Sequence, residues 1–503
     1  MQLPKLKKIT DAQRKRPKIL LLSDDMFTTS GIGTMSRAFV FGTADRFNWV
    51  QLAAAINHHA AGKVIDVSDQ VKTETGVDDA SVKLYPNNGY GDPETLRRLI
   101  EIEKPDAILH FTDPRYWTWL YQMEHELHNR YNIPIAYYAI WDNFPYPHWN
   151  KSAYGSCDLI MGISKQSHLI HNKVLEYADI KTHDISAGAD LKDYEPGDVL
   201  TSYVPHGIDS TVFRPIREGD DDWNEYNLFE TEFRKRHNAE FVVYWSNRNI
   251  RRKQPADVIH SFKLFTDKLP EEARKKCALL LHTAPRDPNG TDLIAVKKAI
   301  APDCNVIFSV DRISNRHLNF YYNLADVTLN IASNEGFGLS SAESVMAGTC
   351  IINNVTGGLQ DQMRFVDDEG NWFTPSNEIS SNHRKKYTKC GEWAFPVWPS
   401  NLSIQGSLET PYIFDDRVHD MDVADALLDV WRVWTLGREK LKLRGLKGRD
   451  WMKGPESNME IASMSNGIAN GLEALLKVWK GGKRFDVYKV DEFKKIVETG
   501  ITL

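Results

Sequence analysis

The sequence predicts an α/β protein made of two Rossmann-like halves. Short apolar runs alternate with helical segments over most of the chain, which is typical of parallel strands covered by helices. A glycine-containing loop follows an apolar run at 28–33 and again at 333–338, and a helical pattern follows each loop. The length of 503 residues also favours two or more domains.

The composition argues against several classes of protein. No run of about 18 uncharged apolar residues occurs, so no membrane span is expected. The basic segment 1–18 lacks the apolar core of a signal peptide, and a cytoplasmic location is expected, in the host if the protein is viral. Five scattered cysteines without a CxxC pair predict reduced thiols. The net charge of −6 argues against a general electrostatic grip on nucleic acid.

In the first half, a strand at 19–23 runs into the loop that contains Gly31 and Gly33. A dinucleotide-binding loop would carry a third glycine where this chain has Ser36, so a dehydrogenase is disfavoured. The other elements predicted for this half are strands at 48–55, 107–111, 133–140 and 158–163, and helices at 93–103, at 116–130 and from Ser164 onward.

The second half repeats the alternation, with strands at 241–245, 277–282, 306–308, 327–331 and 350–352, and helices at 256–265, at 315–324 and from Leu339. Residues 366–415 break the rhythm and are rich in Trp, Pro, Ser and Asn, so they are predicted to be an insertion. Amphipathic helices are expected at 423–434 and 467–479. The domains are expected at 1–204 and 205–470, with a helical segment at 471–503 that returns to the first domain.

The loop at 333–338 is the strongest candidate for a binding site. The first amides of a helix have no partner inside the helix, and the helix dipole is positive there, so phosphate or sugar oxygens are suitable ligands. Glu335 lies in this loop and Glu343 in the helix that follows. A carboxylate at that place can accept hydrogen bonds from vicinal hydroxyls. The alternative is that each glutamate only caps the helix.

The string NEGFGLSSAESVMAG, in which seven residues separate Glu335 from Glu343, resembles the donor-site signature of retaining GT-B glycosyltransferases of family 4. Gly357-Gly358 follows this string. Residues 203–215, YVPHGIDSTVFRP, resemble the interdomain joint of that family, with His206 where the family usually has asparagine. The resemblance implies two facing Rossmann-like domains, with C-terminal helices that cross back onto the first domain.

The resemblance also implies a metal-independent site that needs no cofactor and binds a nucleotide-diphosphate sugar. Arg248 and Lys253 match the Arg and Lys that hold the diphosphate in that family, and Arg252 could share this work. A solvent-facing basic turn is the alternative for this loop. The donor-binding residues implied are Gly31, Gly33, Arg248, Arg252, Lys253, Glu335, Gly336, Phe337, Gly338, Leu339 and Glu343. The family transfers the sugar with retention, by attack on the face that the diphosphate leaves.

One departure concerns the catalytic group. The family often has a histidine where this chain has Trp141, and the candidates to replace it are Asp142, His148 and His110, each of which could equally be structural. The expected catalytic residues are therefore Glu335, Asp142, His110, Arg248 and Lys253. Aromatic segments in the first half predict acceptor contacts from Trp117, Trp141 and His148, although core packing explains some of these residues as well.

Three functions stay open at this point. The acidic balance favours a glycosyltransferase whose acceptor is a glycan, a glycolipid or a small hydroxyl compound. The aromatic segments HFTDPRYWTWLYQMEHE and WDNFPYPHWNKS resemble glycosyltransferases of tailed phages, so modified DNA, with a hydroxymethylated base as acceptor, is the alternative. The third hypothesis is an inactive module that binds a sugar nucleotide. The sequence leaves the base, the sugar and the oligomeric state undetermined.

Overall fold

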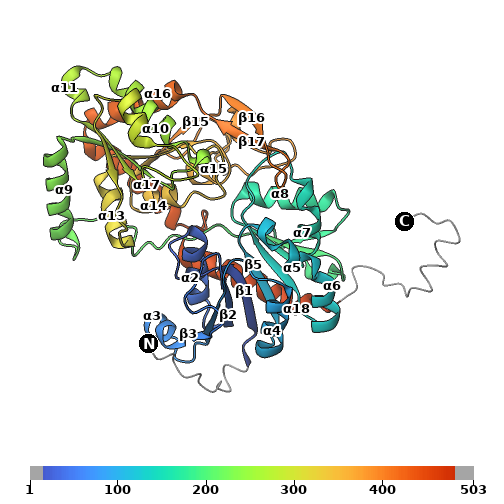
Figure 1. Cartoon of the computed structure of the whole chain (residues 1–503). Coiled ribbons are helices and arrows are strands. Elements are labelled where there is room, and N and C mark those ends of the chain that lie inside the picture. Colours follow the sequence, from blue (N-terminus) through green and yellow to red (C-terminus); the bar gives the residue numbers. More distant parts are fainter. Residues whose placement is uncertain (1–14, 482–503) are drawn as a thin grey trace.

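The computed structural model describes residues 15–481, which form two α/β domains that face each other (Figure 1). Each domain has a largely parallel sheet with helices around it. The predicted architecture of two facing Rossmann-like domains is therefore confirmed. The final part of the predicted returning segment, from residue 482 onward, lies outside the described residues.

The N-terminal domain has a nine-stranded sheet in the order β3-β4-β2-β1-β5-β6-β7-β9-β8. Its neighbours pair in parallel except for β3 and β4. Along β1, Ile19 and Leu21 belong to one apolar core while Leu20 and Leu22 belong to another, as expected for a sheet buried on both faces. The strands are β1 Lys18–Asp24, β2 Asn48–Ala54, β3 Ile65–Asp66, β4 Val82–Pro86, β5 Ala107–Phe111, β6 Ile135–Ala139, β7 Leu159–Gly162, β8 Thr182–Asp184 and β9 Val199–Tyr203.

Side-chain caps set the start of several helices in this domain. Asp92 accepts a hydrogen bond from the Thr95 amide at the start of α4, and Ser164 accepts one from the Ser167 amide at the start of α8. The continuous helix predicted at 116–130 is wrong, because the chain breaks there into several short turns. The helices are α2 Gly31–Gly42, α3 Ser68–Thr75, α4 Pro93–Glu103, η1 Pro114–Trp117, α5 Thr118–Gln122, α6 Glu124–Glu126, η2 Leu127–Tyr131, η3 His148–Asn150, α7 Lys151–Gly155, α8 Lys165–Glu176 and η4 Leu191–Asp193.

The C-terminal domain has a six-stranded parallel sheet in the order β12-β11-β10-β13-β14-β15. The stretch 366–415 is not wholly an insertion, because it supplies the edge strand β15. Pro396 lies in β15, and a proline is tolerated in an edge strand, so the sequence pattern concealed this strand. The strands are β10 Phe241–Ser246, β11 Cys277–His282, β12 Val306–Ser309, β13 Val327–Asn330, β14 Cys350–Asn354 and β15 Ala394–Val397, and an antiparallel hairpin follows with β16 Asn401–Gln405 and β17 Ile413–Arg417.

The last described helix, α18, leaves the C-terminal domain and packs on the N-terminal domain (Figure 1). A Cβ on Gly42 of α2 would lie 2.4 Å from Ser465 Oγ, and Arg46 Nε donates to Glu473 Oε1 at 2.8 Å. The expected boundary at 470/471 therefore falls inside α18, and the return begins earlier. The helices are α9 Trp223–His237, η5 Arg251–Lys253, α10 Pro255–Asp267, α11 Glu271–Arg274, α12 Leu293–Ile300, α13 Asn315–Leu324, α14 Leu339–Met346, α15 Leu359–Met363, η6 Asn382–Arg384, α16 Asp420–Thr435, α17 Arg438–Lys453 and α18 Ile461–Val478.

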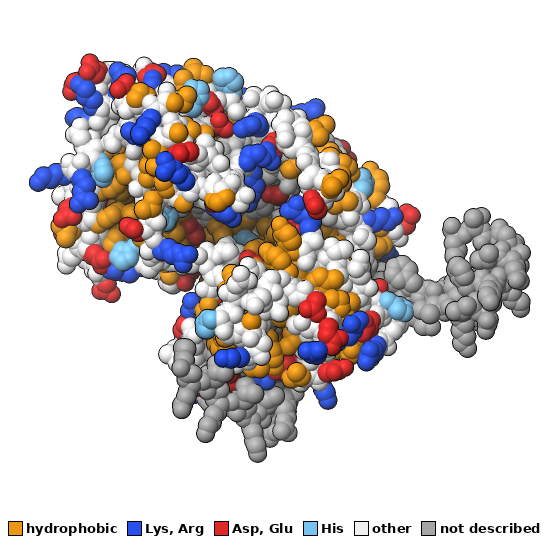
Figure 2. All heavy atoms as spheres, in the orientation of Figure 1, with side chains coloured by type: hydrophobic (Ala, Val, Ile, Leu, Met, Phe, Trp, Pro, Cys, Tyr) orange, Lys and Arg blue, Asp and Glu red, His pale blue; other side chains and the backbone are white. Residues whose placement is uncertain are grey.

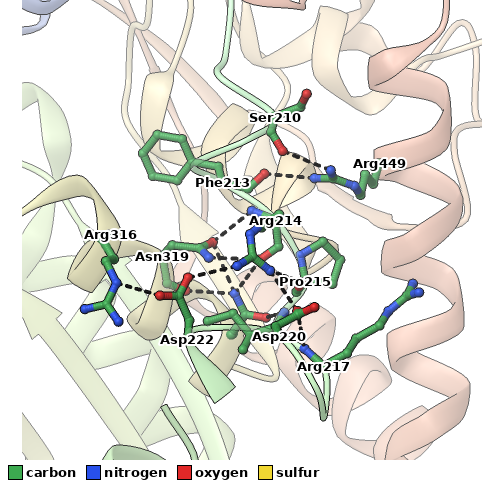
Figure 3. A network of polar contacts seen from close by, with 12 residues as sticks. Ser210, Phe213, Arg214, Pro215, Arg217, Asp220, Asp222, Arg316, Asn319 and Arg449 are labelled. Atoms are coloured by element: carbon green, nitrogen blue, oxygen red, sulfur yellow. Dashed lines mark hydrogen bonds and ion pairs between the residues drawn. The ribbon is translucent and has the colours of Figure 1, made fainter. Parts of the chain in front are cut away.

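The joint between the domains is held by a polar network (Figure 3). Arg214 pairs with Asp220 at 2.7 Å and with Asp222 at 2.9 Å, and its backbone amide donates to Asn319 on α13. Arg449 on α17 donates to the Phe213 carbonyl at 2.8 Å. The segment that enters the C-terminal domain is thus fixed to two of its helices.

Candidate active site

A cleft of about 900 Å³ lies between the domains, at the carboxyl ends of strands from both sheets. Figure 2 shows it as a hollow between the two domains, with basic side chains beside it. The N-terminal domain contributes the loops that follow β1, β5 and β6, and the C-terminal domain contributes the loops that follow β10 and β13. The tip of the β16–β17 hairpin completes the wall.

The loop after β13 forms the predicted strand, glycine loop and helix. Gly338 has a φ of +93°, a conformation that favours glycine, and α14 begins directly after it without a side-chain cap. Gly357 and Gly358 support this turn, because a Cβ on Gly357 would lie 2.0 Å from the Glu335 carbonyl oxygen, which accepts from the Gly358 amide at 2.9 Å. The backbone packing thus presents Glu335 and the first amides of α14 to the cleft.

Two cations share one carboxylate in this loop. Arg252 Nη1 lies 3.1 Å from Glu335 Oε2, and Lys253 Nζ forms an ion pair with the same oxygen. Burial lowers the pKa of Lys253 to about 8, against the attraction of Glu335. Burial alone would raise the pKa of Glu335, but the two cations lower it below its usual value. The group of three side chains has a net positive charge while Lys253 is protonated.

Arg248 does not join this group. Its Nε lies 2.8 Å from Asp287 Oδ2, its side chain is 63% exposed, and it does not line the cleft. The next residue, Asn249, is buried and donates to the Thr291 carbonyl at 2.7 Å, while Arg248 beside it is directed outward. The second cation at the donor loop is therefore Arg252 in this structure, not Arg248.

Two further carboxylates line the cleft. Glu343 on α14 accepts a hydrogen bond from the Tyr322 hydroxyl at 2.6 Å, and burial raises its pKa to about 7. Asp142 follows β6 on the opposite domain, and burial raises its pKa to about 6, although Arg252 opposes this shift. Both groups can change protonation state close to neutral pH.

Three residues expected at the site from their types lie elsewhere. His110 is fully buried, its Nδ1 lies 2.7 Å from the Tyr121 hydroxyl, and Trp117 packs against it in the apolar core with ring centroids 5.2 Å apart. His110 lies on β5, and its side chain points from the face of the sheet into the core. It therefore does not reach the end of the strand, where the cleft lies. His148 is exposed and packs edge-to-face on Tyr177. Neither His110, Trp117 nor His148 lines the cleft.

Of the three residues expected to bind the acceptor, only Trp141 lines the cleft. The indole nitrogen of Trp141 donates to the carbonyl of Asn143 at 3.1 Å. Its ring also packs edge-to-face on Trp149, with centroids 5.6 Å apart. The ring of Trp141 is thus held in place beside the cleft.

The predicted glycines have different roles. A Cβ on Gly336 would lie 2.9 Å from Ile163 Cδ1 of the other domain, and a Cβ on Gly31 would lie 3.1 Å from Leu339 Cδ1. These two glycines allow the domains to approach across the cleft. A Cβ on Gly33 would instead meet Asp25 O at 2.6 Å within its own loop, and Gly33 does not line the cleft. Phe337 and Gly338 line it together with Leu339, as expected.

His206 lines the cleft, and the sequence analysis gave it no site role. Its Nδ1 lies 2.9 Å from the Tyr138 hydroxyl, which itself donates to the Val204 carbonyl. Nδ1 must then carry the proton, which leaves Nε2 as an acceptor. Burial lowers the pKa of His206 to about 3. The only signal in the sequence was the histidine in place of the asparagine usual in the family.

Solved structures with the same architecture are known, although no family model and no curated protein matches the sequence. The Anabaena protein HepE, solved in complex with UDP and glucose, is 12% identical, with a TM-score of 0.57 over 91% of this chain and 100% of its own. The trehalose 6-phosphate synthase of Burkholderia multivorans is 10% identical, with a TM-score of 0.59 over 92% of this chain and 100% of its own.

The sucrose-phosphate synthase of Thermosynechococcus elongatus is 15% identical, with a TM-score of 0.56 over 92% of this chain and 100% of its own. The chain has the GT-B fold. At these identities the likeness establishes the fold alone, and the chemistry of the GT-B cleft has to be argued from its own residues.

Within residues 15–481 there is no group of three or more His, Cys, Asp or Glu side chains that could hold a metal ion, and no helix of the same part is long and apolar enough to cross a membrane.

Proposed function

We propose that this protein is a glycosyltransferase that moves a sugar from a nucleotide-diphosphate donor to a hydroxyl group. One observation carries the proposal: Arg252 and Lys253 share the single carboxylate of Glu335 beside the uncapped start of α14, in the cleft of a GT-B fold. The surplus positive charge and the first helix amides suit a leaving diphosphate. HepE, which has a similar fold, was solved with UDP-glucose, so UDP-glucose is the first donor to test.

The other cleft residues take roles that agree with the resemblance to family 4. Glu343 accepts hydrogen bonds from the ribose hydroxyls of the donor. Glu335 faces the transferred sugar, and the amides between Gly336 and Leu339 contact its oxygens or the phosphate. Arg252 and Lys253 bind the diphosphate, the arginine as a fork and the lysine as a point charge.

In the proposed reaction, the bond between the anomeric carbon and the diphosphate oxygen breaks, and a bond to the acceptor oxygen forms on the same face. The anomeric configuration is retained. The proton of the acceptor hydroxyl passes to the leaving phosphate, and Asp142, with a pKa of about 6, can exchange that proton near neutral pH. The two cations and the helix amides stabilise the developing charge, so no metal is required in this proposal.

The test is a donor screen followed by detection of transfer. A panel of nucleotide sugars that starts with UDP-glucose should contain one that raises the Tm of the full-length chain, since a ligand of the folded state stabilises it. Lys253→Ala should abolish that shift, whereas Arg248→Ala should keep it. Mass spectrometry then detects transfer to candidate acceptors, and the proton coupling at the anomeric carbon reports retention.

Two outcomes would change the proposal. A Tm shift without hydrolysis or transfer for any acceptor would favour the inactive sugar-nucleotide-binding module. Transfer to hydroxymethylated DNA alone would favour the phage-type DNA glycosyltransferase, for which the aromatic Trp141 in the cleft is the supporting observation.

A further inference from the structure

The β16–β17 hairpin belongs to the C-terminal domain but bridges to the N-terminal domain. On its own domain, Asp415 pairs with Arg251 and Asp416 accepts from the Thr356 hydroxyl at 2.6 Å. Across the cleft, the Phe414 amide donates to the Phe144 carbonyl at 2.6 Å. The hairpin is therefore a wall of the cleft that is fixed on both sides.

The tip of the hairpin is latched to the loop after β5. Arg115 Nη1 donates to the hydroxyl of Thr410 at 2.7 Å, and Thr410 is 6% exposed. Tyr412 packs edge-to-face on Trp149 with ring centroids 4.4 Å apart. A partly buried hydrogen bond and an aromatic pair thus hold the tip against the N-terminal domain, next to the cleft residues Asn143 and Gln405.

The cations at this end of the cleft are all paired with carboxylates. Four cations line the cleft among residues 15–481, and each is paired with a carboxylate in the same range: Arg115 with Asp113, Arg251 with Asp415, and both Arg252 and Lys253 with Glu335. Each cation at the hairpin end therefore has its own carboxylate, and Asp142 beside Asn143 is a further one, whereas Arg252 and Lys253 at the donor loop share Glu335. A nucleic-acid backbone would need cations that are free to neutralise its phosphates.

We propose that the hairpin tip, Asn143 and Trp141 form the acceptor subsite, and that this subsite takes a small neutral saccharide or the end of a neutral glycan. This inference rests on the proposed function and names the acceptor for it. The side chains of Asn143, Gln405 and Ser407 offer amide and hydroxyl groups to sugar hydroxyls, and the largely buried Trp141 adds apolar surface beside them.

The size of the cleft agrees with this acceptor. Its volume of about 900 Å³ has to hold the donor as well, and pockets for one ligand measure roughly 300–1,000 Å³. The cleft therefore leaves room for only a small acceptor group beside a nucleotide sugar. Because the hairpin is fixed on both domains, it bounds the cleft on this side.

The experiment uses the full-length chain with the donor selected by the screen, and three acceptor probes: a panel of monosaccharides, a linear neutral polysaccharide and duplex DNA that contains hydroxymethylcytosine. Monosaccharides or chain ends should be accepted, and the DNA should not. Gln405→Ala should raise the acceptor KM at least fivefold with an unchanged donor KM. Thr410→Val, which removes the latch without loss of volume, should raise donor hydrolysis relative to transfer at least threefold.

Leu408→Ser is the matched control on the same hairpin, because Leu408 is 96% exposed and does not line the cleft. It should change neither the acceptor KM nor the ratio of donor hydrolysis to transfer. Transfer to DNA only, or equal effects of Leu408→Ser and Gln405→Ala, would overturn the subsite. If Gln405→Ala and Thr410→Val bind and hydrolyse the donor and keep an unchanged acceptor KM, the proposed subsite is wrong while the proposed function stands. No binding of any donor would overturn the proposed function and the subsite with it.

Discussion

The hydroxyl of Tyr138 lies 2.9 Å from Nδ1 of His206 and gives its own proton to the Val204 carbonyl, also at 2.9 Å. A hydroxyl has one proton, so the hydrogen bond to His206 has to be donated by the imidazole. The ring is thereby fixed in the Nδ1–H tautomer, and Nε2 has no hydrogen-bond partner among residues 15–481. His206 is thus a neutral hydrogen-bond acceptor in the cleft. Its ring also packs on Phe337 of the C-terminal domain, and this contact links the two domains.

The first prediction concerns this tautomer. Because burial lowers the pKa of His206 to about 3, the ring should stay neutral from pH 5 to pH 8. Nitrogen-15 NMR of labelled histidine should show a protonated Nδ1 and an unprotonated Nε2 across this range. Tyr138→Phe should allow both tautomers. An imidazolium signal at pH 6 that belongs to His206, identified by its loss in His206→Gln, would contradict the assignment.

The second prediction separates two arginines of one loop. Arg252→Ala should weaken donor binding by about 1.5–3 kcal/mol, or roughly 10- to 150-fold, because it removes a charged hydrogen-bond donor from the cleft. Arg248→Ala should change the Kd less than twofold, because this side chain pairs with Asp287 outside the cleft. Calorimetry with the selected nucleotide sugar measures both. The reverse order of effects would show that Arg248 moves into the cleft when the donor binds.

The third prediction is a pH dependence of stability. Burial raises the pKa of Glu343 from 4.5 to about 7, so between these values the folded chain binds more protons than the unfolded chain. The contribution of Glu343 to the free energy of unfolding should therefore fall by up to about 3 kcal/mol as the pH rises from 4.5 to 7.5. Glu343→Gln lacks this titration and can still accept from Tyr322. The Tm of the variant relative to the unaltered chain should rise over this range, and a constant difference would refute the shift.

The fourth prediction compares two glycines. Gly336→Ala should lower kcat/KM at least tenfold with little change in Tm, because its Cβ meets Ile140 O and Ile163 of the facing domain at 3.1 and 2.9 Å. Gly33→Ala should lower the Tm, at a cost of about 1–3 kcal/mol, because its Cβ meets its own loop at 2.4 and 2.6 Å. Thermal unfolding and steady-state kinetics of both variants distinguish the two effects. A large loss of Tm in Gly336→Ala would mean that this loop supports folding rather than domain closure.

The fifth prediction is that transfer persists without a metal. The positive charge for the diphosphate comes from Arg252, Lys253 and the start of α14, so EDTA should leave the rate within twofold. Loss of activity in EDTA, with recovery on addition of Mg²⁺ or Mn²⁺, would show that a metal shares this role.

The sequence predicted the elements of the fold with good precision. The strands at 107–111 and 277–282 and the helix at 315–324 have the predicted bounds. Buried parallel strands and capped helices are determined by the pattern of a few neighbouring residues, so these elements could be predicted from the sequence. The edge strand β15 was missed because its proline interrupts the usual pattern of a strand.

The sequence predicted only part of the candidate site. The succession of apolar run, glycine loop and helical pattern predicted the loop, because strand, turn and helix start lie within about fifteen residues and fix each other locally. The resemblance to family 4 drew attention to Glu335 and Glu343. Lys253 was among the predicted cations, and in the structure it forms an ion pair with Glu335. The choice of Arg252 over Arg248 was not predictable, since it depends on the burial of Asn249 against a segment some forty residues away.

The sequence by itself therefore determined two Rossmann-like domains, the glycine loop and the positive charge next to it. The tertiary structure alone decided that His110 and Trp117 are core residues, that His206 enters the cleft, and that a hairpin from 401–417 forms its wall. The physical reason is that backbone periodicity and helix starts depend on short-range interactions. The direction of a side chain, toward the core or toward the cleft, depends on which distant elements pack against it.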